Sequence, residues 1–301
     1  FFLIIFFTLY CIYFLLQQTM IRDQKTRYQY LAINESNYII SCIDKVVVRT
    51  YMMRAMIIEN DGGYEFFDKM SDTIYKSVAT DTGVNLKNIA IAPDSIVTKV
   101  YPLGGNESFV GFDYSDTSKL GNKEAVEAYS MGKTIITNPF DLMKGGVGMS
   151  IRTPVYIKEG NETKLWGMLS ATMDFDNLLH AFNLDNLTKM NLDYRLWYTD
   201  DNGEKVIIAD TGARMNGARS ESFEVYNLKW NLDIEPKSGW FNVASDIIAK
   251  VIILFVSFCL TLVIMLILRI REDGQKMKLI AEQDSLTHCY SRHYLNSVIL
   301  D

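Results

Sequence analysis

The sequence is short of histidine and cysteine, and each shortage narrows the classes of protein to which it can belong. Only three histidines occur in 301 residues, and two of them, His288 and His293, follow the last apolar segment. This distribution excludes a histidine-rich metal site in the middle of the chain. The four cysteines do not form a disulfide framework either, because Cys42 is the only one between the two apolar segments.

An excess of basic residues is also absent. The chain has 30 Lys and Arg against 36 Asp and Glu, which gives a formal net charge of -6. Nucleic-acid binding depends on cations that neutralise phosphates, so nucleic acid is not a predicted partner. Neither a glycine-rich phosphate loop nor a nucleophile-elbow pattern occurs, and no catalytic residue is predicted within these 301 residues.

Long apolar runs are present at both ends, and they predict two transmembrane helices. The first covers residues 1–16, which span roughly 24 Å as a helix, less than the ~30 Å core of a bilayer. Because it is short and begins with Phe, we expect this span to continue upstream. A signal peptide is the alternative, although no small-residue cleavage site follows. The second span is predicted at residues 247–270, where Lys250 and Arg269 flank an uncharged run.

A long helix is predicted after the first span, over residues 17–61, because 17–60 contain neither Pro nor Gly. Apolar or small residues recur along it at spacings of three and four. They are Ile39, Ile43, Val46, Thr50, Met53 and Ile57. This stripe either packs on the chain's own domain or forms a dimer stalk, and both can hold along different stretches of one helix.

Short strands and helices alternate over the next 180 residues. Val147–Tyr156 and Leu165–Asp174 read as strands joined by a turn, and Phe175–Met190 has helical periodicity. A second set of strands follows, with a hairpin signal at Asp200–Gly203. The predicted fold class is α+β, with a long stalk helix and two units built on antiparallel sheets, at residues 62–182 and 183–242.

Several motifs in this region come in a characteristic order. They are Ile91–Val97, Tyr101–Glu107, Gly111–Tyr114, Gly145-Gly146 with Gly148, Arg152–Tyr156, Trp166-Gly167, Asp174, and Trp230 with Pro236 and Gly239-Trp240. Together they resemble CHASE-type extracellular sensor domains over roughly residues 17–240. The resemblance implies a membrane-distal and a membrane-proximal PAS-like unit, with a small-molecule ligand bound in the distal one.

Ligand contacts are expected among the residues of these motifs. Arg152 on a strand is suited to a carboxylate or phosphate, although a surface arginine at a strand end, or an internal ion pair with Asp113 or Asp174, is an equally good interpretation. Aromatic and thioether side chains on or beside the strands either line a pocket or belong to the core. The candidate ligand-binding residues are Tyr101, Asp113, Tyr114, Met149, Arg152, Thr153 and Asp174.

The C-terminal residues carry a second resemblance. A linker helix is predicted at 271–283, and Asp284-Ser285-Leu286-Thr287 follows it. This tetrapeptide resembles the opening of GGDEF diguanylate cyclase domains, and residues 284–301 are interpreted as the start of one. His288, Cys289, Ser291 and His293 depart from the family pattern. The resemblance implies an intact protein that makes cyclic di-GMP from GTP with Mg²⁺ or Mn²⁺; no cofactor is expected in the present residues.

The sequence therefore predicts a multi-pass protein of the inner (plasma) membrane. Its extracytoplasmic sensor would bind a small molecule and, as a homodimer, regulate a cytoplasmic diguanylate cyclase. The alternatives are the same sensor coupled to a histidine kinase or chemoreceptor output, and a tethered binding module without output.

Overall fold

The computed structural model describes all residues except 117, 119–121, 143–144, 242, 283–288 and 291–301. The chain divides into two compact units. One consists of Phe1–Gln24 with Ser238–Asp301, and the other of Lys25–Lys237. The motif at Asp284–Thr287, on which the cyclase resemblance rests, lies outside the described residues.

Helix α1 runs from Phe2 to Glu59, so its second half belongs to the unit Lys25–Lys237. It ends at a left-handed turn, where Gly62 has φ 89 and its N–H donates to the Ile57 carbonyl at 2.8 Å. A glycine is suited to this position because it adopts a positive φ without steric cost.

The first sheet of this unit has six strands, all antiparallel to their neighbours, in the order β2-β1-β6-β5-β3, with β4 also paired to β5. The long hairpin β5–β6 forms its centre. Its strands are β1 (Leu86–Pro93), β2 (Lys99–Tyr101), β3 (Ile135–Ile136), β4 (Phe140–Asp141), β5 (Val147–Glu159) and β6 (Glu162–Asp174). Helix α2 (Phe67–Thr82) precedes β1 in the sequence, whereas η1 (Glu107–Phe109) and α3 (Asn122–Met131) lie between β2 and β3.

The second sheet has four antiparallel strands in the order β8-β7-β10-β9. They are β7 (Leu192–Thr199), β8 (Lys205–Asp210), β9 (Arg219–Val225) and β10 (Leu228–Pro236). Two short helices, α4 (Phe175–Ala181) and α5 (Asp185–Lys189), connect β6 to β7. Mixed helix and antiparallel sheet confirms the predicted α+β fold class.

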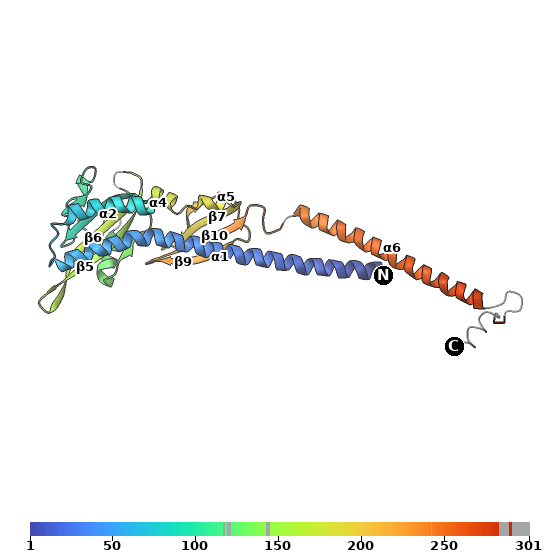
Figure 1. Cartoon of the computed structure of the whole chain (residues 1–301). Coiled ribbons are helices and arrows are strands. Elements are labelled where there is room, and N and C mark those ends of the chain that lie inside the picture. The colour runs from blue at the N-terminus through green and yellow to red at the C-terminus, as the bar shows by residue number, and fades with distance from the viewer. Residues whose placement is uncertain (117, 119–121, 143–144, 242, 283–288, 291–301) are drawn as a thin grey trace. The chain divides into compact units, whose positions relative to one another are not determined.

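The second half of α1 crosses both sheets and contributes to one hydrophobic core with them (Figure 1). The stripe of residues from Ile39 to Ile57 is buried in this core; Ile43 and Met53 are fully covered. Of the two interpretations left open by the sequence, packing on the chain's own sheets therefore holds for this stripe. Tyr38, Val48 and Met52 lie on α1 outside the core and are exposed.

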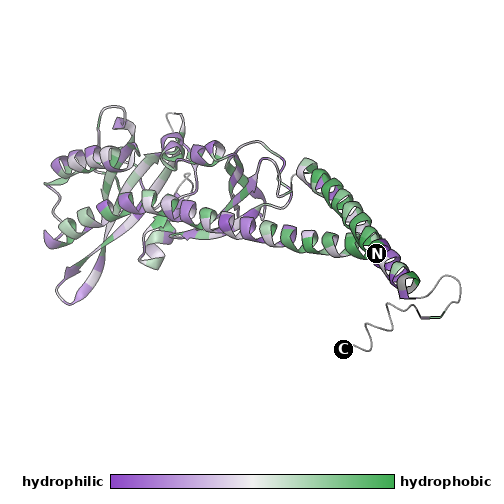
Figure 2. Cartoon of the chain, turned by 45° about the vertical axis from the view of Figure 1, so that its right-hand side comes forward, coloured by the Kyte–Doolittle hydropathy of each residue, from purple (hydrophilic) through white to green (hydrophobic). Residues whose placement is uncertain are grey.

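Among the residues that the structure describes, two helices are long and apolar enough to cross a membrane, judged by length and composition. They are α1, in its apolar first part, and α6 (Val243–Glu282). Hydrophobic residues dominate these two segments, whereas the rest of the chain is mixed (Figure 2). None of the apolar window of α1 and 6% of that of α6 is buried, unlike the core helix of a soluble protein.

Candidate functional site

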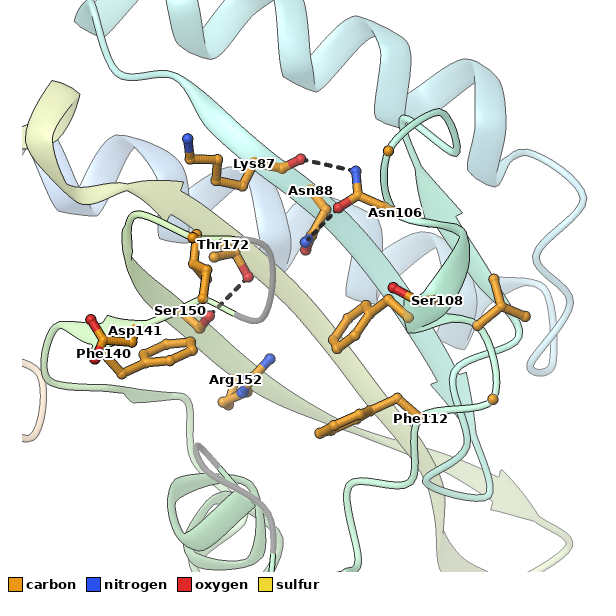
Figure 3. Close-up of a pocket in the computed structure, with 16 residues that line it drawn as sticks. Lys87, Asn88, Asn106, Ser108, Phe112, Phe140, Asp141, Ser150, Arg152 and Thr172 are labelled. Atoms are coloured by element: carbon orange, nitrogen blue, oxygen red, sulfur yellow. Dashed lines mark hydrogen bonds between the residues drawn. The ribbon is translucent and has the colours of Figure 1, made fainter.

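A cavity of about 940 Å³ lies on the six-stranded sheet, on the face opposite α1. Its lining comes from segments that are far apart in the sequence (Figure 3). They contribute Lys87, Asn88, Gly105, Asn106, Ser108, Phe109, Val110, Gly111, Phe112, Phe140, Asp141, Leu142, Gly145, Ser150, Arg152 and Thr172. A volume of this size accommodates a small organic molecule.

Polar side chains form the floor of the cavity. Successive residues of a strand point to opposite faces of the sheet, so Ser150 and Arg152 on β5 share one face. Ser170 and Thr172 pair with them across the β5–β6 ladder. All four are buried, and the hydroxyls of Ser150 and Thr172 lie 2.8 Å apart. A buried polar floor beneath a cavity is suited to hydrogen bonding with a ligand.

Arg152 is the charged group at this floor, and it is only 3% exposed. Its Nη1 donates to the Tyr114 hydroxyl at 2.9 Å and to Ser170 Oγ, and its guanidinium carbon lies 4.6 Å from the centre of the Tyr114 ring. Its Nε is buried without an acceptor. Among the residues that the structure describes, no carboxylate forms an ion pair with this guanidinium.

A second buried polar atom without a hydrogen-bond partner lies at the wall formed by Asn88 and Asn106. Asn106 Nδ2 donates to the Pro102 carbonyl at 2.9 Å, and its Oδ1 accepts a hydrogen bond from Asn88 Nδ2 at 3.4 Å. This network turns Asn88 Oδ1 away from Asn106, and within the described part of the chain this buried oxygen accepts no hydrogen bond. The site therefore contains an acceptor atom without a hydrogen bond, Asn88 Oδ1, in addition to the Nε of Arg152.

Aromatic rings form the apolar walls between these polar groups. The rings of Phe109 and Phe112 lie with their centroids 5.0 Å apart, and Phe112 contacts Tyr114 edge to face at 5.4 Å. Arg152 lies between the side chains of Phe112 and Phe140 in the view of Figure 3. A cation framed by apolar rings binds an anionic group more strongly than a cation in water, because the surroundings screen the charge poorly.

An ion pair lies at the rim of the cavity. Lys87 Nζ is 2.5 Å from an Asp174 carboxylate oxygen, and the other carboxylate oxygen accepts a hydrogen bond from the Asn177 N–H at 3.2 Å, which caps α4. Partial burial acts to raise the pKa of Asp174, but the bonds from Lys87 and Asn177 outweigh it, and the pKa is lowered. The Asp174 carboxylate is therefore ionised at neutral pH.

The structure brings together only some of the seven residues predicted as ligand contacts. Arg152 and Tyr114 contact each other at the floor, and Asp174 reaches the rim through Lys87. Neither of the two carboxylates considered as partners for Arg152, Asp113 and Asp174, pairs with it.

The remaining four lie away from the cavity lining. Met149 and Thr153 are on β5 but face α1, where Thr153 Oγ1 lies 3.3 Å from Thr50 Oγ1. Tyr101 donates to an Asp72 carboxylate oxygen at 2.5 Å. Asp113 accepts from the N–H of Ser115 at 2.8 Å. Their role in ligand binding stays a prediction.

Several residues of the cavity lining, and Ser170 beside it, were not predicted as ligand contacts from the sequence. Ser150, Ser170 and Thr172 left a signal, because polar residues occupy alternate positions of two otherwise apolar strands. Asn88 and Phe140 left none, because their place at the site depends on how distant segments pack together.

Residues 72–208 match the CHASE domain. The match runs from α2 to β8, includes the whole floor of the cavity, and covers somewhat under half of the chain. Among curated proteins, no sequence matches this chain.

A solved structure of low sequence identity shares the fold. An extracellular ligand-binding receptor from Desulfohalobium retbaense DSM5692 has a TM-score of 0.52 at 9% identity. The alignment covers 68% of the present chain but only 39% of that receptor, and at this identity the similarity concerns the fold alone.

Two chemoreceptor structures align less closely. The ligand-binding domain of Campylobacter jejuni Tlp3, solved with 4-methylisoleucine, has a TM-score of 0.43 at 11% identity, and covers 74% of this chain and 93% of its own. A structure described as methyl-accepting chemotaxis protein X has a TM-score of 0.38 at 14% identity, with 70% and 98% covered.

Proposed function

We propose that this chain is a membrane-anchored sensor whose cavity on the six-stranded sheet binds a small molecule with a carboxylate or phosphate group. In the intact protein, this binding regulates a cytoplasmic diguanylate cyclase. The match to the CHASE domain, an extracellular sensor domain, supports the sensor role.

The observation that carries the ligand proposal is the buried guanidinium of Arg152 without a carboxylate partner. Burying an unpaired charge costs several kcal/mol, on the order of the whole stability margin of a domain. An anionic ligand offsets this cost, because a guanidinium donates two parallel hydrogen bonds to a carboxylate or phosphate. The aromatic walls favour a ligand with an apolar body attached to its anionic group.

The membrane placement rests on the two apolar helices. The sensor unit lies between them in the sequence, so two spans put its two ends on the same side of the bilayer. A cyclase domain that follows α6 must lie in the cytoplasm, because it uses cytoplasmic GTP. The sensor unit, which precedes α6, then lies on the extracytoplasmic side of the inner membrane.

The output proposal rests on the Asp284–Thr287 resemblance alone. The intact cyclase would bind GTP with Mg²⁺ or Mn²⁺. Reading the coding sequence beyond Asp301 tests this proposal. A Gly-Gly-(Asp/Glu)-Glu-Phe motif downstream supports it, whereas a phospho-accepting histidine helix or a methyl-accepting helix contradicts it.

The ligand proposal is tested with the full chain in lipid nanodiscs. Thermal unfolding is recorded with benzoate, succinate and inorganic phosphate, for the wild type and for Arg152→Met. At least one anion is expected to raise the unfolding temperature of the wild type. In Arg152→Met, loss of a buried charge partner costs about 2 kcal/mol or more, so affinity falls about 30-fold.

The same variant separates a binding role from a structural one. Methionine fills a similar volume without a charge, so Arg152→Met is expected to be as stable as the wild type or more stable when no anion is present. An anion that stabilises both proteins equally, or no stabilisation by any anion, contradicts the proposal.

A further inference from the structure

The edge strand β3 of the six-stranded sheet is hydrogen-bonded on both sides. The Thr137 N–H donates to the Ser150 carbonyl at 2.9 Å, towards β5. Because the direction of these bonds alternates along an antiparallel strand, Ile136 turns its N–H and C=O away from β5. Such outward groups of an edge strand are normally left for water or for another chain.

The side chain of Asn227 binds both outward groups of Ile136. The Ile136 N–H donates to Asn227 Oδ1 at 2.7 Å, and Asn227 Nδ2 donates to the Ile136 carbonyl at 2.9 Å. The amide thus takes the place of a peptide group of an additional strand. Since Asn227 lies in the turn between two strands of the four-stranded sheet, this pair of bonds links the two sheets.

Asn227 is the second residue of the two-residue turn between β9 and β10, which the Val225–Leu228 pair closes. The first residue, Tyr226, has φ 59, a conformation that tyrosine rarely adopts. Its hydroxyl donates to an Asp44 carboxylate oxygen on α1 at 2.6 Å. Both turn residues are therefore held by neighbouring elements, which fixes the direction of the Asn227 amide.

The other side of β3 contacts the cavity floor. Ile135 is paired with Arg152, and Thr137 Oγ1 accepts a hydrogen bond from the Ser150 N–H at 2.9 Å. Arg152 and Ser150 both line the cavity. A displacement of this part of β5 is therefore expected to displace β3, and through β3 the side chain of Asn227.

We propose that Asn227 couples the cavity to the strand that leads towards α6. A change at Arg152 moves β3, the Asn227 amide follows Ile136, and β10 shifts because it begins at the next residue. β10 is an inner strand of its sheet and ends at Pro236, shortly before α6 begins. This inference rests on the proposed function, because the coupling would transmit ligand binding in the cavity towards α6.

Amide hydrogen exchange of the full chain in nanodiscs tests the coupling without any ligand. Wild type, Arg152→Met, Asn227→Ala and the double variant are compared at Ile136 and along β10. Asn227→Ala is expected to speed exchange at Ile136 about tenfold, the effect of losing its hydrogen bond. Arg152→Met is expected to change exchange along β10 when Asn227 is present, and to leave it unchanged in the Asn227→Ala background.

Asn202→Ala serves as the matched control, because Asn202 lies in the exposed β7–β8 turn of the same sheet and its amide bonds only within that turn. It is expected to preserve the response of β10. Ser150→Ala is a second change at the cavity floor, should Arg152→Met fail to fold. A β10 response that persists without Asn227, or no response to either cavity variant, overturns the proposal.

Failure of the coupling through Asn227 can be distinguished from failure of the proposed ligand binding. If no anion binds but the Arg152→Met effect reaches β10 through Asn227, only the ligand assignment fails. If an anion binds at Arg152 and β10 responds independently of Asn227, only the coupling fails.

Discussion

Asp174 combines two roles at the junction between β6 and α4, as the cap of the helix and as the partner of Lys87. We predict that Asp174→Ala lowers the free energy of unfolding by about 1 kcal/mol, the usual cost of losing a helix cap. Asp174→Asn is expected to lose less at pH 7, because asparagine is an equally good cap and the partly exposed ion pair contributes little. Urea unfolding of the three proteins at pH 7 measures both effects.

The lowered pKa of Asp174 also predicts a pH dependence. A carboxyl whose pKa is lower in the folded state stabilises the fold above its unfolded pKa of about 3.9, and this stabilisation disappears as the pH falls through the folded value. The stability difference between wild type and Asp174→Asn is therefore expected to shrink below about pH 3.9. A difference that stays constant from pH 7 to pH 3 would show that the charge of Asp174 contributes nothing.

At the scale of elements, α1 presents one face to the core and another outward. We predict that Ile43→Ala, on the buried face, lowers the free energy of unfolding by about 3 kcal/mol, through lost apolar contacts and a cavity. Val48→Ala, on the exposed face of the same helix, is expected to change it by less than about 0.5 kcal/mol. Equal losses at the two positions would contradict the packing of α1 described above.

Regular patterns allowed most elements to be predicted from the sequence. The apolar runs, the uninterrupted helix before Gly62 and the strands around Ser150 and Ser170 follow local periodicity. The helical periodicity of Phe175–Met190 corresponds to two short helices, because Asn183 adopts φ 56 and separates α4 from α5. Asparagine tolerates this conformation, and its presence alone does not show that a helix will end.

The candidate site was less predictable than the fold for a similar reason. Arg152 stood out as a lone cation in an apolar strand, which is a local feature. The two-residue strand β4 exists only through its pairing with β5, so its own residues do not show that a strand forms there. The Asn227 bonds to Ile136 likewise join residues 91 positions apart.

At the scale of the whole molecule, we propose that two copies associate through the exposed face of α1. Val48 and Met52 are apolar, exposed and one helical turn apart on this face. In a background without the native cysteines, Val48→Cys is expected to form a disulfide between two copies in the membrane. Ile43→Cys is expected to form no such disulfide, because this side chain lies in the core. Absence of a cross-link at position 48, or equal cross-linking at positions 43 and 48, would contradict this arrangement.

The buried guanidinium of Arg152 is proposed to make the cavity select ligands with a negative charge. Calorimetric titration of the full chain in nanodiscs with phenylacetate and with its neutral amide, phenylacetamide, tests it most directly, because the two differ little except in charge. Phenylacetate is expected to bind the wild type more tightly than the amide, and Arg152→Met is expected to abolish this difference in affinity. Equal affinity of the two compounds for the wild type, or a preference that survives in Arg152→Met, would contradict it.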